Sequence, residues 1–205
     1  MDSKKIIGLN KNRIQQNLLP FIELLKQNDA PYFYFSGGCL RDILLGKKPN
    51  DYDMFTTSLE DVDKLVDILK TLNFQEMYST EHSVKLFLLN IQVDISKEFF
   101  TEPLDTKRNK GYDFTINCIA FDSDYNLYYH KNFFKHLSDL SLVRVNTSPP
   151  LLEMRYIKFL SNNFYSDYTP LSKIEDMDIK SEKLLATHGG NYPKINLEKF
   201  CNNNL

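Results

Sequence analysis

Two aspartates near residue 50 are the residues whose type and spacing best suit chemistry. Asp51-Tyr52-Asp53 follows a turn and has the pattern of a strand. Because side chains alternate along a strand, Asp51 and Asp53 would share one face, about 7 Å apart at ~3.3 Å per residue. Two carboxylates so placed can hold a hard divalent cation, Mg2+ or Mn2+, together with the phosphate oxygens of a substrate. The pair is therefore a candidate metal site.

A pair of glycines lies just before these aspartates in the chain. The aromatic run at residues 32–35 predicts a buried strand, which ends at Gly37-Gly38, and residues 39–45 predict a short helix. Adjacent glycines allow positive φ and a close approach of the backbone to a ligand. The N–H groups at the start of the helix suit a phosphate. A phosphate-binding turn followed by a metal-binding pair is what nucleotidyl transfer requires.

Residues 37–56, GGCLRDILLGKKPNDYDMFT, closely resemble the first motif of one family. This family is the head domain shared by bacterial-type CCA-adding tRNA nucleotidyltransferases and bacterial poly(A) polymerases, within the polymerase-β-like nucleotidyltransferase superfamily. Its motif reads Gly-Gly-x-Val-Arg-Asp-x-Leu-Leu-Gly, four residues, Asp-x-Asp, two residues, Thr. Only the Val position differs, as Leu40. The resemblance implies that Gly37, Gly38 and Arg41 bind a nucleoside triphosphate, and that Asp51 and Asp53 are the catalytic metal ligands.

The segment at residues 107–120 resembles the second motif of the same family, Arg-Arg-Asp-Phe-Thr-Ile-Asn-Ala. Residues 113–117, DFTIN, match it. In the family this motif contacts the sugar and the phosphates of the nucleotide. The resemblance therefore implies that Asp113 and Asn117 position the sugar.

The two arginines of the second motif are replaced here by Gly111 and Tyr112. Charge-assisted contacts to phosphate are among the stronger hydrogen bonds, so this replacement removes cationic partners of a triphosphate. Arg108 and Lys110 lie close by and are the candidates to supply the charge from another angle. Tyr112 is alternatively a stacking platform for a base or a ribose.

A third carboxylate, Asp94, stands on the second of two predicted strands, at residues 84–89 and 91–95, which would form a hairpin around Asn90. Enzymes of this superfamily often place a third carboxylate on a strand next to the Asp pair. Asp94 is therefore a third catalytic candidate, and the alternative is an exposed aspartate at the end of a strand.

Later segments resemble the family less closely. Asp139 and Arg144 occupy a shortened version of its Asp-Leu, four residues, Ile-Arg element, and Lys158 stands on the following predicted helix where arginine is usual. The nearest string to the family's base-reading motif, Glu-Asp-x-x-Arg, begins at Glu175 but has Ile179 in place of the arginine. Isoleucine cannot replace the planar donor fork of arginine. We therefore expect no ordered C-C-A addition by this chain alone.

The composition describes a globular protein: 205 residues, 42% hydrophobic and 25% charged, with a net charge of −2. A slightly negative net charge does not favour binding of long nucleic acid through the overall charge of the protein. The three cysteines and four histidines lack the spacing of a zinc site. No apolar stretch has the length or position of a signal peptide or a membrane span, so we expect a cytoplasmic protein without a membrane partner.

The predicted fold is α/β (α+β): a small mixed or largely antiparallel sheet flanked by helices. Apolar spacing predicts helices at residues 12–28, with a kink or a break at Pro20, at residues 59–71, with Ser58 as the N-cap, and at residues 151–164. We expect a nucleotidyltransferase head domain at residues 1–150 and a short helical extension, a truncated neck, at residues 151–205. Members of the resembled family continue into a helical body and tail that hold tRNA. A homodimer or a partner subunit is the expected replacement for those parts.

The resemblance implies a metal-dependent transferase that moves a nucleoside monophosphate from a triphosphate to an acceptor hydroxyl, at the 3′ end of tRNA or another RNA. One alternative is nucleotidylation of a protein or a small molecule, as in small toxin-like nucleotidyltransferases. A second alternative is a non-catalytic relic that binds nucleotide or RNA. The Asp51/Asp53 pair favours an enzyme, because a relic has no physical need for two like charges on one strand face.

Overall fold

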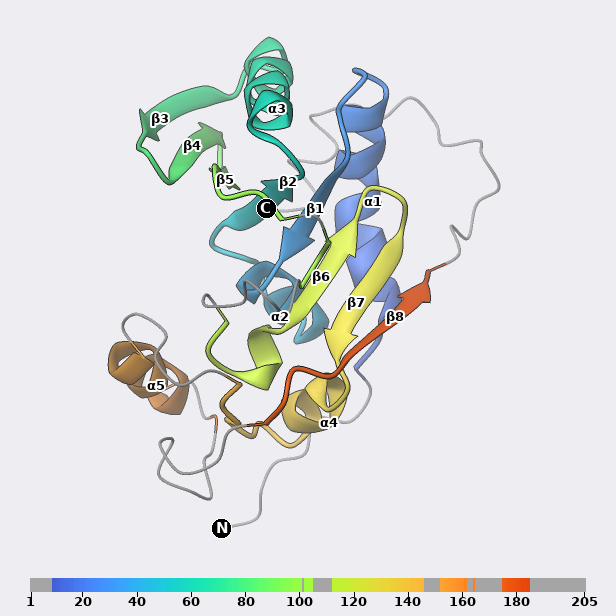
Figure 1. Cartoon of the computed structure of the whole chain (residues 1–205), viewed down its shortest axis with the longest axis vertical. Coiled ribbons are helices and arrows are strands. Elements are labelled where there is room, and N and C mark those ends of the chain that lie inside the picture. The colour runs from blue at the N-terminus through green and yellow to red at the C-terminus, as the bar shows by residue number, and fades with distance from the viewer. Residues whose placement is uncertain are drawn as a thin grey trace.

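The structure is a computed structural model that describes residues 9–100, 102–104, 112–145, 152–161, 164 and 175–184 (Figure 1). These residues form one eight-stranded sheet in the order β3-β4-β5-β2-β1-β6-β7-β8. Strands β2 and β5 run parallel, and the other neighbouring pairs are antiparallel. The predicted α/β class with a largely antiparallel sheet is confirmed.

The strands are β1 (Phe33–Ser36), β2 (Tyr52–Thr56), β3 (Gln75–Ser79), β4 (Ser83–Leu88), β5 (Ile91–Ser96), β6 (Ile119–Asp122), β7 (Asn126–His130) and β8 (Ile179–Lys183). The helices are α1 (Asn12–Lys26), α2 (Gly38–Leu44), α3 (Leu59–Thr71), α4 (Phe133–Ser138), α5 (Leu152–Ser161) and the 3-10 turn η1 (Thr115–Asn117). The bounds predicted for α1, α2, α3, the β4–β5 hairpin and β1 lie within two residues of these, whereas α5 ends three residues before the predicted end.

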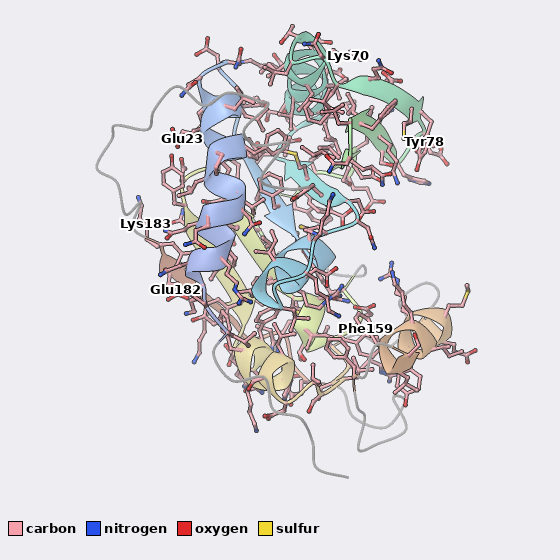
Figure 2. All side chains as sticks on the ribbon, turned by 180° about the vertical axis from the view of Figure 1, so that it is seen from behind. Glu23, Lys70, Tyr78, Phe159, Glu182 and Lys183 are labelled. Atoms are coloured by element: carbon pink, nitrogen blue, oxygen red, sulfur yellow. The ribbon has the colours of Figure 1, made fainter. Side chains whose placement is uncertain are left out.

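The main core lies between the sheet and the helices α1, α2 and α3, and α1 runs along the back of the strands (Figures 1 and 2). Helix α1 is one helix through Pro20, although the sequence predicted a kink or a break there. Helix α3 begins at Ser58, whose Oγ accepts a hydrogen bond from the Asp61 N–H at 3.1 Å. This N-cap was predicted from the residue types and holds α3 directly after β2.

Strand β1 is buried on both faces, which places it at the centre of the sheet. Phe33 and Phe35 pack into the main core, and Tyr34 packs into a second cluster on the opposite face, with Leu104 and Ala120. A strand covered on both sides cannot shift its register without exposing one apolar set. The turn that follows β1 at Gly37 is therefore held at a fixed place.

Strand β8 comes from the segment that was predicted to be a helical extension. It pairs with β7 over five residues, from Asn126↔Lys183 to His130↔Ile179, and completes one edge of the sheet. Helix α5, from the same segment, lies beside the lower end of the sheet (Figure 1). The domain boundary at residue 150 stays a prediction.

Candidate active site

A pocket of about 300 Å³ opens where α2, β2, the η1 turn and α5 come together. The residues that line it are Gly38, Cys39, Arg41, Asp42, Asn50, Asp51, Asp53, Asp113, Asn117, Arg155, Lys158 and Phe159. Six of the residues predicted from the sequence are among them, and they come from both motifs. The fold therefore brings the two motifs, which are about 60 residues apart in the chain, to one cavity.

Asp51 and Asp53 lie side by side on one wall of the pocket. Strand β2 starts at Tyr52, one residue later than predicted, and alternation turns Tyr52 into the core while its two neighbours line the cavity. Burial, followed by the charges of Asp51 and Asp94, raises the pKa of Asp53 to about 7. Among the described residues, no hydrogen bond or ion pair reaches either the Asp51 or the Asp53 carboxylate.

This pair has the donor chemistry of a divalent-cation site. Its oxygens are hard ligands. Burial first, and then the neighbouring negative charge, raise the pKa of Asp53, and a bound cation would offset both effects. No group of three His, Cys, Asp or Glu side chains suited to a metal occurs among the described residues. Two carboxylates, with waters and substrate phosphates, nevertheless match how Mg2+ is usually bound. The residues present therefore fit Mg2+ or Mn2+.

Asp94 lies on β5 directly opposite Asp53 in the parallel register. Its carboxylate is half-buried and forms an ion pair with Lys85 of β4, with Nζ 3.3 Å from Oδ2. Burial by itself lowers the pKa of Lys85. Hydrogen bonds with Tyr78 and Asp94 outweigh this effect and raise the pKa above its ordinary value. Asp94 therefore faces the pair without lining the pocket, and the predicted hairpin that carries it is confirmed.

The glycine pair shapes the turn between β1 and α2. Gly37 has φ of 77° and its N–H donates to the Ile119 carbonyl at 2.9 Å, which joins the turn to β6. A residue with a side chain is strained at this φ. Gly38 lines the pocket, and a Cβ there would meet the Arg41 guanidinium at 3.4 Å. The close approach expected from the sequence is available at Gly38.

Arg41 links the two motifs. Its Nε and Nη2 contact Asp42 Oδ1 at 2.9 and 2.8 Å, and its Nη1 donates to Asn117 Oδ1. The guanidinium also stacks over the Phe159 ring, 4.9 Å from the centroid. Contacts with Asp42, Asn117 and Phe159 thus fix the Arg41 side chain, which also lines the pocket.

Asp113 is almost fully buried and is held by three donors. Its Oδ1 accepts from the Phe114 N–H and from Asn117 Nδ2, both at 2.7 Å, and its Oδ2 contacts Arg155 Nη1 at 3.3 Å. Asp113 and Asn117 therefore adjoin each other as predicted. Asp113 also ties helix α5 to the η1 turn through Arg155.

The remaining predicted residues lie elsewhere. Arg108 and Lys110, like Gly111, fall outside the described residues. Tyr112 is not among the pocket-lining residues, and its hydroxyl forms a hydrogen bond with Ser36 Oγ at the end of β1. Asp139 ends α4, and Arg144 is buried in a bridge with Phe114, away from the pocket.

Helix α5 contributes three pocket residues that the site prediction did not include: Arg155, Lys158 and Phe159. Figure 2 shows Phe159 on the side of α5 that faces the rest of the molecule, where it is 7% exposed and meets Phe114 edge-to-face at 5.5 Å. The resemblance had pointed to Lys158 on this helix. What the sequence could not show was that α5 closes the pocket, because this depends on the Asp113–Arg155 contact.

A family model for Gabija anti-defense 2 family proteins matches residues 9–140, more than half of the chain. The chain belongs to the Gabija anti-defense 2 family. In this family member the matched region contains the carboxylates, the glycine turn and η1, whereas α5 and β8 lie beyond it. None of the curated proteins compared with the chain matches it.

Solved structures of CCA-adding enzymes share the fold of this family member. A Thermotoga maritima CCA-adding enzyme complexed with tRNA aligns with a TM-score of 0.57 and 21% identity over 80% of this chain and 41% of that chain. A complex of a CCA-adding enzyme with CTP aligns with a TM-score of 0.59 and 20% identity, over 76% of this chain and 41% of that chain. A tRNA-processing enzyme in an apo form aligns with a TM-score of 0.57 and 21% identity, over 80% of this chain and 45% of that chain.

The likeness to CCA-adding enzymes predicted from the motifs is therefore confirmed as a shared fold. The chain spans less than half the length of these enzymes. Among the described residues, no helix combines the length and the apolar character needed to cross a membrane.

Proposed function

We propose that this protein is a metal-dependent nucleotidyltransferase that moves a nucleoside monophosphate from a triphosphate to an acceptor hydroxyl. The observation that carries the proposal is the position of Asp51 and Asp53, side by side in a pocket that also contains Gly38 and Arg41. The shared fold with CCA-adding enzymes supports the same reaction class.

In this proposal each wall of the pocket has its own part. Asp51 and Asp53 hold the cation, with Asp94 as the third carboxylate beside them. The cation, when bound, supplies positive charge that offsets the phosphate charge and favours the ionised acceptor hydroxyl. The Gly37-Gly38 backbone and Arg41 bind the triphosphate. The acceptor oxygen bonds to the α-phosphorus as the bond to the pyrophosphate oxygen breaks.

The opposite wall orients the nucleotide. Asn117, fixed between Asp113 and Arg41, presents its amide beside the pocket and suits a contact to the sugar. Arg155 and Lys158 of α5 add two cationic side chains on this wall, where the second motif lacks its arginines. Arg108 and Lys110 stay predicted phosphate contacts.

The acceptor that the resemblance supports first is an RNA 3′ end, because the solved relatives are CCA-adding enzymes, one of them complexed with tRNA. The family description favours a second candidate, an acceptor that belongs to the Gabija defence. In both cases the same pocket performs the transfer.

A dimer or a partner subunit also remains a prediction. Light scattering on the purified protein tests the dimer.

A direct test uses nucleoside triphosphates labelled at the α-phosphate, with Mg2+ and, in parallel, total RNA and purified Gabija proteins. Label on RNA supports the first acceptor, and label on a protein supports the second. A γ-labelled triphosphate is the control, because nucleotidyl transfer leaves the γ-label on pyrophosphate. Asp53→Asn should lose the transfer, and Asp63→Asn, a matched change on the exposed side of α3, should keep it. No α-label on RNA or protein would contradict the proposal.

A further inference from the structure

A polar row crosses one face of the sheet, from the edge strand β3 to the Asp pair. Tyr78 of β3 lies opposite Lys85 of β4, Lys85 opposite Asp94 of β5, and Asp94 opposite Asp53 of β2. Directly paired residues in neighbouring strands project from the same face of a sheet. The four side chains therefore stand in one line that ends at the pocket.

Lys85 occupies the middle of this row and is held on two sides. Its Nζ lies 3.3 Å from Asp94 Oδ2, with the two side chains 16% and 22% exposed, and 5.5 Å from the centre of the Tyr78 ring. Figure 2 shows Tyr78 at the outer edge of the sheet. The neighbours Val84 and Leu86 are buried in the main core, so the strand cannot turn Lys85 away.

At the inner end of the row, Asp94 stands in register with Asp53, and the charges of Asp94 and Asp51 both act on the Asp53 carboxyl. Among the described residues, Lys85 forms the ion pair with these carboxylates, whereas Arg155 across the pocket is paired with Asp113. Lys85 and Arg155 both counteract the negative charge that acts on Asp53. Lys85 is thus the cation that belongs to the sheet side of the carboxylate group.

Stability alone does not explain a lysine at this place. A half-buried ion pair loses hydration that its attraction only partly offsets, so its net contribution to folding is small. A pair of apolar residues would cover the same strands at no such cost. The position of the pair, in register with Asp53, suggests a role in the chemistry of the site.

We propose that Lys85, supported by Tyr78, is a positioning residue that orients Asp94 toward the Asp pair and limits how tightly Asp51 and Asp53 bind a divalent cation. This inference rests on the proposed function. Lys85 acts through Asp94 and touches neither substrate nor cation. Its loss therefore lowers turnover, leaves the affinity for the triphosphate unchanged, and tightens binding of the cation, because a repelling charge has gone.

The test compares Lys85→Met, which removes the charge but keeps the length, with Lys85→Arg, which keeps the charge. For Lys85→Met we expect kcat to fall by roughly tenfold, within the range for residues that support metal ligands. KM for the triphosphate should stay within about twofold, and the Kd for Mn2+, measured by electron paramagnetic resonance, should fall by at least about threefold. Lys85→Arg should keep kcat and the Kd for Mn2+ close to their wild-type values. Lys64→Met, on exposed α3, is the matched control.

A double variant shows whether Lys85 works through Asp94. In an Asp94→Asn background, Lys85→Met should cause little further loss of kcat, because the partner that it orients is already gone. A full additional loss would overturn the inference. So would a Lys85→Met protein that melts at a lower temperature but has wild-type kcat and wild-type Mn2+ affinity, which is the behaviour of a merely structural ion pair.

The metal titration separates this inference from the proposed function. If the wild-type protein transfers no nucleotide, the proposed function fails, and the Mn2+ arm alone then decides the role of Lys85. Tighter Mn2+ binding in Lys85→Met, with recovery in Lys85→Arg, would support that role. An unchanged Mn2+ affinity in Lys85→Met would overturn it.

Discussion

The two walls of the pocket are built in different ways. The first wall, α2 and β2, comes from one contiguous stretch and carries Asp51 and Asp53, which no other described residue pairs with. The second wall, η1 and α5, comes from distant segments, and its Asp113 and Arg155 are paired with each other. The difference supports the proposal that the first wall takes a charged ligand, whereas charges on the second wall also hold the wall together.

The largest expected effect comes from the first wall. Asp53→Asn should lower transfer by more than the ~10–100-fold typical of residues that only support metal ligands, because it removes a ligand itself. The fold should survive this change. Steady-state turnover with Mg2+ is the measurement, and near wild-type turnover would remove the proposed mechanism.

The same variant should be more stable than the wild type in metal-free buffer. The pKa of Asp53 is raised to about 7 in the folded protein by burial and by its carboxylate neighbours, against about 4 in an unfolded chain. As the pH rises, Asp53 therefore loses its proton in the unfolded state before it does so in the folded state. The wild type consequently loses stability as the pH rises from about 4 to 7. Asp53→Asn should lack this loss. Thermal melts with a chelator across this pH range would show two parallel curves if the idea is wrong.

The next effect tests the close approach at Gly38. Gly38→Val should weaken triphosphate binding by roughly tenfold or more, because branched methyl groups would fill the space beside Arg41. Its free energy of unfolding should change little, since Gly38 faces the pocket. Gly38→Ala, whose Cβ has an ordinary contact at 3.4 Å, is the graded control. Equal affinities in calorimetry would make Gly37-Gly38 a plain turn.

On the second wall, Arg155 and Lys158 should respond differently. Arg155→Met leaves buried Asp113 without its cation and should cost about 1–2 kcal/mol of stability, less than for a fully buried pair because Arg155 is half exposed. Lys158→Met should lose less stability than Arg155→Met, because Lys158 is exposed, and it should raise KM for the triphosphate a few-fold, because it removes a positive charge from the pocket. Urea unfolding and initial rates check both. Equal stability losses would erase the difference between these two roles.

The smallest effect concerns the choice of base. Glu175 and Asp176 do not line the pocket: Glu175 Oε2 accepts from Asn132 Nδ2 at 2.8 Å, and the Asp176 carbonyl contacts His130 Nε2 at 2.9 Å. With Ile179 in the arginine position, the chain should lack one bidentate base contact, worth ~1–3 kcal/mol. A tRNA without its end, supplied with each triphosphate singly and mixed, should gain one kind of nucleotide or an unordered tail. Faithful C-C-A addition, without a partner protein, would contradict this expectation.

The first wall was predictable because its information is local. An aromatic strand, two glycines, a helix and an alternating Asp pair follow one another within residues 32–56, and each has a sequence signature. The Ser58 cap and the hairpin that carries Asp94 were local in the same sense. The sequence therefore predicted both the fold class and the carboxylate side of the pocket.

The remaining parts depend on tertiary contacts or on weak patterns. Strand β3 is exposed throughout, and β8 has the sequence IKSEK, so neither has the apolar alternation that marks a strand. Both are edge strands, where neighbouring strands and not side-chain burial select the structure. Helix α5 was predicted as a helix, but its place in the pocket depends on the ion pair of Arg155 with Asp113.

Strand β8 has a consequence for how the chain is made. A ribosome releases β7 well before β8, and until β8 emerges, the outer edge of β7 displays unpaired N–H and C=O groups. A nascent chain that stops before residue 179 keeps that edge open, and open edges recruit other strands. Once β8 has paired, it becomes the edge strand in its turn, and its charged sequence IKSEK discourages the pairing that the edge of β7 would invite. A shortened gene that ends near residue 150 would lose this charged edge.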